Sequence, residues 1–447
     1  MSVYRHDLKR RIEQFLSTPM DVTKRLWEVQ VSSGTLGSSG AISKPAVISI
    51  YQNAMDQTVN PNGVGGEGGG STTGGVSSWP SGHKLMESIL LFRFHHSIGD
   101  AVSLVSALGD LFDESLELKN MIHAEIKRRR ILKQSVGFWK RCLKWIQKIL
   151  WFVIGSITAL IRHGYLIATT PQNPFLQVLN GTSSHNTMPE SQGRSISWCD
   201  VASVQEVKRV AKAIGPKVTI NDVFVSCVSK AIARQFQEHR ERQVHPLQLQ
   251  QQQQEQQEQE GSGKGGPIES INVVIPAHLA GGILPPGREV GNMLGAFVAK
   301  IPGEIVDVNS TATSRLLQVH SSLDTGKRSP APILGYLMAR FSSQFLPERL
   351  AVHCFRKSNA NAAVAVTNAR GYPEKVHING RRVESIQGFL PLPPGLPVGI
   401  VVGSYGNLVS LSINAEKWAV PDGDKFLGWI IDEYKLLCKE VAITGQS

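Results

Sequence analysis

The chain has 447 residues, enough for two domains with sizeable cores, and its hydrophobic content of 41% is ordinary for a globular protein. Its five cysteines are scattered without Cys-x-x-Cys spacing, which argues against a disulfide framework and a zinc site. The formal net charge is +11, and the charged N-terminal stretch lacks the apolar core of a secretory signal peptide. The sequence therefore predicts a globular protein with reduced thiols and an excess of positive charge.

Two apolar stretches near the N-terminus predict strands, at residues 25–31 and 88–94. Between them, residues 32–82 are rich in glycine and serine and cannot bury enough apolar surface to order themselves, so we expect a disordered insertion. Three glycines in this insertion satisfy the Gly-x-Gly-x-x-Gly spacing of a dinucleotide site. No strand precedes them and no apolar helix follows, so the spacing does not indicate a nucleotide site.

The second predicted strand leads directly into a short polar turn and then a helix that begins near residue 101. His95 and His96 lie where the strand ends, and Asp100 lies where it can cap the helix. Adjacent strand residues point to opposite faces, so only one of the two histidines can face a given site. This junction is the first candidate for a functional site, although a capped helix beside a buried histidine pair would give the same pattern.

A strongly basic segment follows, and an uncharged apolar run at residues 149–161 adjoins it. The run is too short to span a bilayer comfortably, since a spanning helix needs about 20 apolar residues. We expect a helix lying in the membrane interface; a buried inter-domain helix with a solvated basic face and a nucleic-acid-binding segment are the alternatives. The nine basic residues are Lys127, Arg128, Arg129, Arg130, Lys133, Lys140, Arg141, Lys144 and Lys148.

The second half of the chain alternates between predicted helices and strands in an α+β pattern. Residues 238–266 form a Gln- and Gly-rich stretch that we expect to be a disordered insertion. We expect an N-terminal domain over 1–170 and a C-terminal domain over 195–447. The elements expected in the second domain are a strand and helix from 195, a helix over 219–236, strands near 271–279, 294–302, 362–369, 381–390, 398–406 and 408–416, and a helix over 422–441.

Several reaction types lack their motifs in this chain. No Gly-x-Ser-x-Gly elbow, P-loop or His-Glu-x-x-His occurs, which argues against a serine hydrolase, a P-loop nucleotidase and a zinc protease. A metal site at the two histidines is awkward because they point to opposite faces. A single histidine at a strand end suits a general base, which could take the proton from a hydroxyl while its oxygen attacks an activated acyl carbon.

The junction does not stand alone, because its sequence resembles the His-His-x-x-x-Asp-Gly motif of the wax ester synthase/diacylglycerol acyltransferase family. Five further segments resemble that family in the same order along the chain, and the resemblance extends over nearly the whole chain outside the two insertions. The six segments are TPMDVTKRLWE (18–28), HHSIGDA (95–101), VTINDVFVSCVSKAI (218–232), GNMLGAFVAKIP (291–302), AVTNARG (365–371) and LVSLSINAEKWAVPD (408–422).

The resemblance implies two chloramphenicol-acetyltransferase-like domains of α+β class with a channel between them. It implies an O-acyltransferase that moves a fatty acyl group from acyl-CoA to a long-chain alcohol or to diacylglycerol. His96 would be the general base, Asp100 would fix the loop, and His95 would face away and support the strand. The resemblance also points to Asn221, with Asp222, and Asn368 as residues that shape the substrate site; each could equally be a helix cap or a turn residue.

The resemblance further implies that acyl-CoA is a substrate and that no cofactor or metal is needed. The expected partners are acyl-CoA, the acceptor lipid and an anionic membrane surface, with no nucleic acid. We expect a membrane-associated protein on the cytosolic face of the endoplasmic reticulum, with the plasma membrane and lipid droplets as alternatives.

The sequence also departs from the family pattern. The N-terminal domain is shorter, Ala101 replaces the final glycine of the motif, and the arginine usual near VVIPAHL is not evident. These departures keep two alternatives open: a catalytically impaired lipid-binding relative, and a condensation-type acyltransferase acting on another acceptor.

Overall fold

The protein is described by a computed structural model. The described residues are 2–17, 27–35, 86–94, 99–134, 147, 149–150, 152–158, 161, 173–180, 189, 193–251, 267–282, 291–304 and 311–444. They form two compact units, residues 1–98 and residues 99–447, so the helices that follow Asp100 group with the second unit. Most of the predicted 32–82 insertion and the end of the 238–266 insertion lie outside the described residues.

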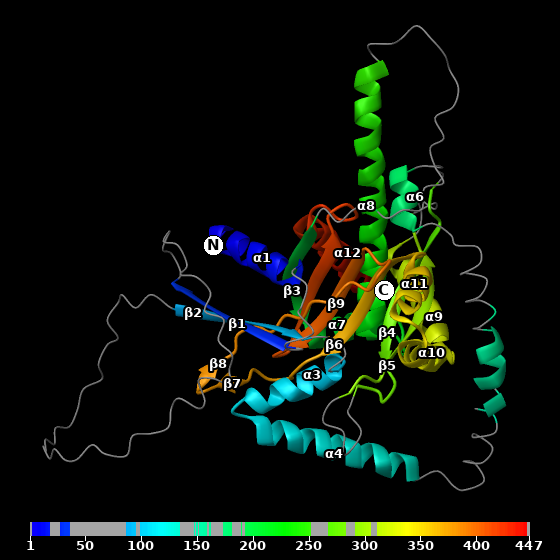
Figure 1. Ribbon diagram of the computed structural model, residues 1–447. Helices are drawn as coiled ribbons and strands as arrows, with labels where there is room; N and C mark the ends of the chain where they lie inside the picture. Colours follow the sequence, from blue (N-terminus) through cyan, green and yellow to red (C-terminus); the bar gives the residue numbers. More distant parts are fainter. Residues whose placement is uncertain are drawn as a thin grey trace, which may run out of the picture. The chain divides into compact units, whose positions relative to one another are not determined.

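Within its described residues, the first unit contains one helix, α1 (Ser2–Ser17), and one antiparallel strand pair (Figure 1). The strands are β1 (Trp27–Thr35) and β2 (Met86–Phe94), in a register that places Trp27 opposite Phe94. Both predicted strands are therefore confirmed. Strand β1 runs into the first residues of the expected insertion, because Ser32 and Ser33 continue the ladder with β2.

The second unit is organised around a six-stranded mixed sheet with the order β3-β10-β9-β6-β4-β5. Strand β6 pairs in parallel with β4 and β9, and the other neighbours are antiparallel. The α+β class is therefore confirmed. The six strands are β3 (Arg194–Ser203), β4 (Ser270–His278), β5 (Leu294–Pro302), β6 (Ala362–Arg370), β9 (Val398–Tyr405) and β10 (Leu408–Glu416).

Helices and a small hairpin complete the second unit (Figure 1). The hairpin pairs β7 (His377–Ile378) with β8 (Arg381–Arg382). Besides the helical residues 152–158, the helices among the described residues are α3 (Ala101–Leu108), the 3-10 turn η1 (Gly109–Leu111), α4 (Ser115–Gln134), α6 (Pro174–Asn180), α7 (Val204–Ile214), α8 (Ile220–Gln251), α9 (Ala312–Arg328), α10 (Ala331–Phe345), α11 (Glu348–Asn359) and α12 (Gly423–Thr444).

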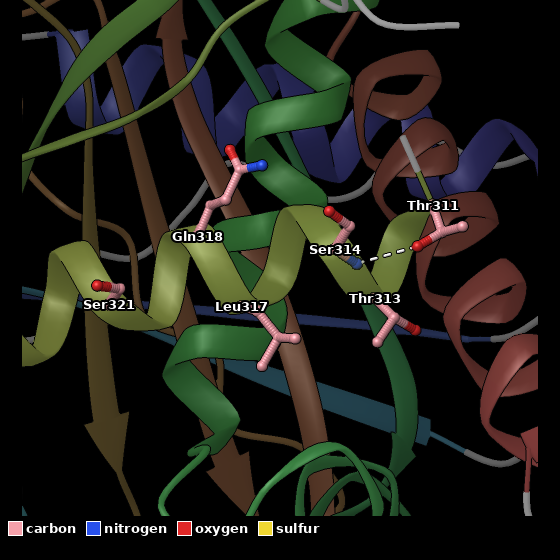
Figure 2. Close-up of a pocket in the computed structure, with 6 residues that line it drawn as sticks. All are labelled: Thr311, Thr313, Ser314, Leu317, Gln318 and Ser321. Atoms are coloured by element: carbon pink, nitrogen blue, oxygen red, sulfur yellow. Dashed lines mark hydrogen bonds between the residues drawn. The ribbon is translucent and has the colours of Figure 1, made fainter. Parts of the chain in front are cut away.

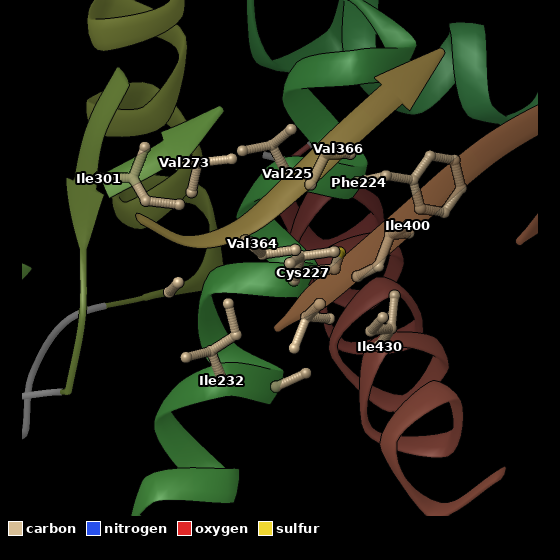
Figure 3. Packing of buried hydrophobic residues seen from close by; sticks show 14 of the residues in the cluster. Phe224, Val225, Cys227, Ile232, Val273, Ile301, Val364, Val366, Ile400 and Ile430 are labelled. Atoms are coloured by element: carbon tan, nitrogen blue, oxygen red, sulfur yellow. The ribbon is translucent and has the colours of Figure 1, made fainter. Parts of the chain in front are cut away.

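The main core lies between the sheet and helices α8, α9 and α12 (Figure 3). Side chains from α8, among them Phe224 and Ile232, pack with Ile430 of α12 and with strand residues such as Val364 and Ile400. All five are fully buried, and each buried side chain of this size contributes about 1.5–3 kcal/mol. This core fixes the sheet from which the candidate site is built.

The segment between β8 and β9 corrects one expected strand. Only Arg381–Arg382 of the expected 381–390 strand pairs with another strand. The carbonyls of the following residues accept hydrogen bonds from side chains instead: Asn414 Nδ2 donates to Leu390 O at 2.9 Å, and Tyr405 Oη donates to Val383 O at 2.7 Å. The segment needs no strand partner because side chains satisfy these backbone groups.

The second insertion is also shorter than expected. Helix α8 continues past residue 236 to Gln251, so the first part of the 238–266 stretch is helical. Glutamine, glutamate and arginine are good helix formers, and the glycines that end the pattern come only later. The expectation of disorder from low apolar content was therefore wrong for residues 238–251.

Candidate active site

Asp100 is buried at the start of α3, with 1% of its surface exposed. Its Oδ1 accepts a hydrogen bond from Ser103 N at 3.0 Å, which makes Asp100 the N-cap of the helix. Its Oδ2 accepts a second hydrogen bond from Met293 N at 2.8 Å. The carboxylate thus joins the start of α3 to the segment that leads into β5.

Three more hydrogen bonds join the same two segments. Asp100 N donates to Gly291 O at 3.2 Å, Gly291 N donates to Ser103 Oγ at 3.1 Å, and Ser103 Oγ donates to Gly291 O. The described end of HHSIGDA and the start of GNMLGAFVAKIP, two stretches that resemble the acyltransferase family separately, therefore meet in space. The meeting point is the buried carboxylate of Asp100.

His278 is a third member of this site that the sequence did not indicate. It ends β4, its side chain is 7% exposed, and its Nε2 lies 3.5 Å from Asp100 Oδ2. Its Nδ1 accepts a hydrogen bond from Gly282 N at 3.1 Å, so the proton of the neutral ring belongs on Nε2, facing the carboxylate. This Nε2 has no hydrogen-bond partner within the described part of the chain. His278 lies in VVIPAHL, the stretch in which the arginine usual in the family is missing.

Asn368 lies at the same edge of the sheet. Strands β4, β6 and β9 pair in parallel, so their carboxyl ends meet at one edge, and β5 starts there because Leu294 is opposite His278. Asn368 is an exposed residue near the end of β6, within the strand expected over 362–369. The structure thus brings Asp100, His278 and Asn368 to one edge of the sheet.

The far side of α3 is held by Tyr372, which follows β6. Its Oη donates to Val105 O, and its ring meets the ring of Phe112 edge-on at 5.0 Å between centroids. Burial raises the pKa of the Tyr372 phenol, which keeps it protonated as a donor. Hydrogen bonds therefore fix the start and the middle of α3 to segments next to the sheet.

The predicted pair at the start of α8 has different surroundings. Asp222 is fully buried and accepts hydrogen bonds from Thr219 N at 2.8 Å and Lys327 Nζ at 3.1 Å, and its Oδ2 lies 2.9 Å from His320 Nδ1. These contacts cap α8 and tie it to α9, which is a structural role. Asn221 is 8% exposed, and its Oδ1 has no hydrogen-bond partner among the described residues. Among the described residues, Asn221 Oδ1 is therefore without a hydrogen-bond partner, whereas both carboxylate oxygens of Asp222 have partners.

His95 and His96 lie outside the described residues. Their roles as supporting residue and general base remain predictions from the sequence.

A hollow on α9 is lined by hydroxyl, amide and leucine side chains and is separate from the groups around Asp100 (Figure 2). Thr311 caps α9 there by accepting a hydrogen bond from Ser314 N at 3.1 Å.

In the described ranges, no three histidine, cysteine or acidic side chains are grouped as metal ligands. Among the helices that the structure describes, none has the length and apolar character needed to cross a membrane.

A coupling between Asp100 and His278 can be measured by a double-mutant cycle. We expect His278→Ala to destabilise the protein, and its effect to shrink in an Asp100→Ala background because the partner is gone. Contacting residues of this kind show coupling free energies of about 0.5–3 kcal/mol. Urea unfolding of the four proteins gives the value. Additive effects would mean that the 3.5 Å approach of the two groups contributes nothing.

The site combines the aspartate of a His-His-x-x-x-Asp motif with one edge of a mixed α+β sheet, as expected of an acyltransferase-like domain. Comparison with known proteins agrees with this class: residues 290–437 match the model of the WS/DGAT C-terminal domain. A curated relative, wax ester synthase/diacylglycerol acyltransferase 11 of Arabidopsis thaliana, is 20% identical over 365 residues, which cover 80% of this chain and 71% of that protein. The resemblance to the wax ester synthase/diacylglycerol acyltransferase family is therefore confirmed.

Solved structures of related enzymes superpose only loosely. The wax ester synthase/diacylglycerol acyltransferase from Marinobacter aquaeolei VT8 is 15% identical with a TM-score of 0.35, over 60% of this chain and 55% of that chain. A condensation domain of the enacyloxin polyketide synthase is 14% identical with a TM-score of 0.40, over 78% of this chain and 58% of that chain. This chain thus spans little more than half of either solved chain, and the resemblance to the family rests on the two sequence matches.

Proposed function

We propose that this chain is an acyl-CoA-dependent O-acyltransferase whose acceptor is a long-chain alcohol or diacylglycerol. The observation that carries the proposal is the hydrogen bond from Met293 N to Asp100 Oδ2 at 2.8 Å. It joins the His-His-x-x-x-Asp motif to the region that matches the WS/DGAT C-terminal domain. Two similar proteins are named wax ester synthase/diacylglycerol acyltransferase, and these names support the proposed substrate class.

In the proposed reaction, His96 removes the proton from the acceptor hydroxyl as its oxygen attacks the thioester carbon of acyl-CoA. The new ester C–O bond forms, the C–S bond breaks, and the proton passes to the departing CoA thiolate. A thiol has a pKa near 8.5, on the order of the cysteine reference value, so the thiolate leaves with little acid assistance. Asp100 takes no part in the proton transfer; it holds the start of α3, four residues after His96, in place.

The test uses purified full-length protein with labelled palmitoyl-CoA and, in separate reactions, hexadecanol, diacylglycerol or a small polar amine. We expect a labelled wax ester, a labelled triacylglycerol, or both. Product only with the amine would favour a condensation-type enzyme. Acyl-CoA binding without product would favour a lipid-binding relative, and either result would contradict the proposal.

We further propose that the basic segment 127–148 attaches the protein to an anionic membrane, with the cytosolic face of the endoplasmic reticulum as the expected compartment. Basic residues near the end of α4 support this proposal: Lys127 and Arg128 are exposed and Arg129 is half-buried. A basic residue at an anionic surface is worth about 1 kcal/mol. Two of them, Arg128 and Arg129, also pair with Glu125 at 2.8 and 2.9 Å. Their hydrogen bonds lower the pKa of Glu125 to about 2, so this carboxylate stays charged wherever membrane binding is tested.

Charge reversal at Arg128, Arg129 and Arg130 should weaken binding to anionic vesicles, and added salt should weaken the binding of the unaltered protein, because exposed charges are screened within a Debye length. Flotation with vesicles at low and high salt measures both effects. Glu125→Gln is the matched control: it breaks the same intrahelical pairs but leaves all three arginines in place, so its binding should not fall. Vesicle binding that changes neither with salt concentration nor on charge reversal would contradict an electrostatic attachment.

A further inference from the structure

Helix α10 exposes a stripe of large apolar side chains. Ile333, Leu337, Phe341 and Phe345 follow one another at four-residue intervals and are 43%, 48%, 56% and 69% exposed. This spacing puts them on one face of the helix. A polar face would be usual on the solvent side of a surface helix, so the stripe needs an explanation.

The opposite face of α10 already has a partner. Pro332 is buried against β5, where a side chain at Gly295 would collide with the Pro332 backbone, and a Cβ at Gly335 would lie 3.0 Å from Ala296 O. The helix is thus fixed to the sheet by one side. Its apolar stripe is free of that packing and points away from it.

Helix α11 extends the apolar surface. It lies against α10, and Leu350, Val352 and Phe355 are 46%, 38% and 46% exposed. Figure 1 shows α10 and α11 together beside α9. We define the docking face as the exposed apolar side chains of α10 and α11.

The docking face also continues onto the helical residues 152–158. A Cβ at Gly155 would lie 2.8 Å from Pro330 Cδ, immediately before α10, so this segment touches the start of that helix. Its exposed apolar side chains include Val153, Ile154 and Ile157, at 50%, 64% and 54%. The described part of the apolar run that follows the basic segment therefore contacts the start of the helix that carries the docking face.

The charges on these helices have one predominant sign. Across α10 and α11 the exposed charged residues are four basic ones, Arg340, Arg349, Arg356 and Lys357, and one acidic one, Glu348. Apolar helix faces combined with an excess of arginine and lysine are the pattern of helices that lie in the membrane interface. The excess complements an anionic surface.

We propose that the docking face is a second membrane-binding surface, which inserts its apolar side chains among the lipids of an anionic membrane. The inference does not depend on acyl transfer, because binding to vesicles requires no chemistry. If the protein is also the proposed acyltransferase, the docking face brings the unit that carries Asp100 to the lipid phase that holds the apolar substrates.

The test compares the full chain with a variant that carries Leu337→Ser, Phe341→Ser and Phe345→Ser. Flotation with phosphatidylcholine vesicles, with and without phosphatidylserine, should show at least about a tenfold loss of partitioning, since three large apolar contacts are removed. The loss should persist at high salt, because burial of hydrocarbon is not screened by ions.

The matched control replaces three leucines that are exposed elsewhere: Leu317→Ser on α9, Leu408→Ser on β10 and Leu436→Ser on α12, which are 46%, 41% and 45% exposed. It loses as many exposed apolar side chains and should float like the unaltered protein. Equal flotation of the docking-face variant and this control would overturn the proposal. A change in the oligomeric state of the docking-face variant without a change in flotation would also overturn it, in favour of a second copy as the occupant.

A second measurement leaves the apolar residues of the docking face unchanged. It uses Cys354, an exposed cysteine on α11. An environment-sensitive fluorophore is attached there after Cys142, Cys199 and Cys438 have been replaced by serine. Anionic vesicles should raise its emission and shift it to shorter wavelength. The fluorophore could instead emit strongly and at short wavelength without vesicles and show no change when they are added. That result would show that protein covers the docking face and would overturn the proposal.

Discussion

Replacing His96 with alanine should lower the rate of acyl transfer by about 10²–10⁴-fold, the usual effect of removing a general base. The acceptor hydroxyl is a poor nucleophile while it keeps its proton, and no other group in the motif is expected to take that proton. The loss should appear in kcat with either acceptor, because both acceptors react through a hydroxyl. Product formation from labelled palmitoyl-CoA, followed over time, measures it.

The control is His95→Ala in the same assay. Adjacent residues at the end of a strand point to opposite faces, so His95 should support the strand and its loss should reduce the rate far less. Circular dichroism and thermal unfolding establish that both variants are folded. Near-normal turnover by folded His96→Ala protein would refute His96 as the general base. A larger loss of activity in His95→Ala than in His96→Ala would indicate that His95 is the base and His96 the supporting residue.

Asp100→Asn should destabilise the protein by about 1–3 kcal/mol and should also reduce activity. The two carboxylate oxygens accept hydrogen bonds from two backbone donors, Ser103 N and Met293 N. An amide has only one oxygen, so its NH2 group would face a donor in this buried site. The substitution also removes the charge that faces His278 Nε2. Urea unfolding at neutral pH measures the stability, and the same assay measures the activity.

Asp113→Asn is the matched control for this substitution. Asp113 also accepts two backbone hydrogen bonds, from Asn379 N at 3.0 Å and Gly380 N at 2.7 Å, but at an exposed position. Water can replace a lost partner there, so the destabilisation should be smaller and activity should be unchanged. Equal stability and equal activity of Asp100→Asn and the unaltered protein would remove the structural role of Asp100.

Several strands of the second unit could be predicted from the sequence because they are buried apolar runs bounded by proline, glycine or asparagine. The structure places β5 at Leu294–Pro302 and β10 at Leu408–Glu416, the bounds that were expected. The same reasoning failed at 381–390, where Val383 and Ile386 gave an apolar pattern but pack as a loop on a small separate core. A repeating apolar pattern indicates that side chains are buried. It corresponds to a strand only where the backbone also pairs with a neighbouring strand.

The three helices α9, α10 and α11 were not predicted. Helix α10 is apolar on the face that packs on β5 and also on its exposed face, so it lacks the one-sided pattern from which a surface helix is recognised. The feature that hid α10 from sequence reasoning is therefore the same exposed stripe that leads to the proposed membrane contact.

The candidate site was predicted in part. A conspicuous motif marked Asp100, and its capping of a helix follows from its place at the start of an apolar periodic segment. His278 could not be found in this way, because a lone histidine at a strand end carries no motif and its contact with Asp100 joins distant parts of the chain. The one available signal was the absence of an arginine that the family usually has in the same stretch.

The central claim is direct transfer of the acyl group to the acceptor hydroxyl with His96 as base and no acyl-enzyme. Rapid mixing of the full chain with palmitoyl-CoA, followed by quantification of free CoA and ester, tests it most directly. Without an acceptor we expect no burst of CoA, and with hexadecanol or diacylglycerol we expect CoA and ester to form in equal amounts. A burst of CoA equal to the amount of protein in the absence of any acceptor, or no ester with either acceptor, would contradict it.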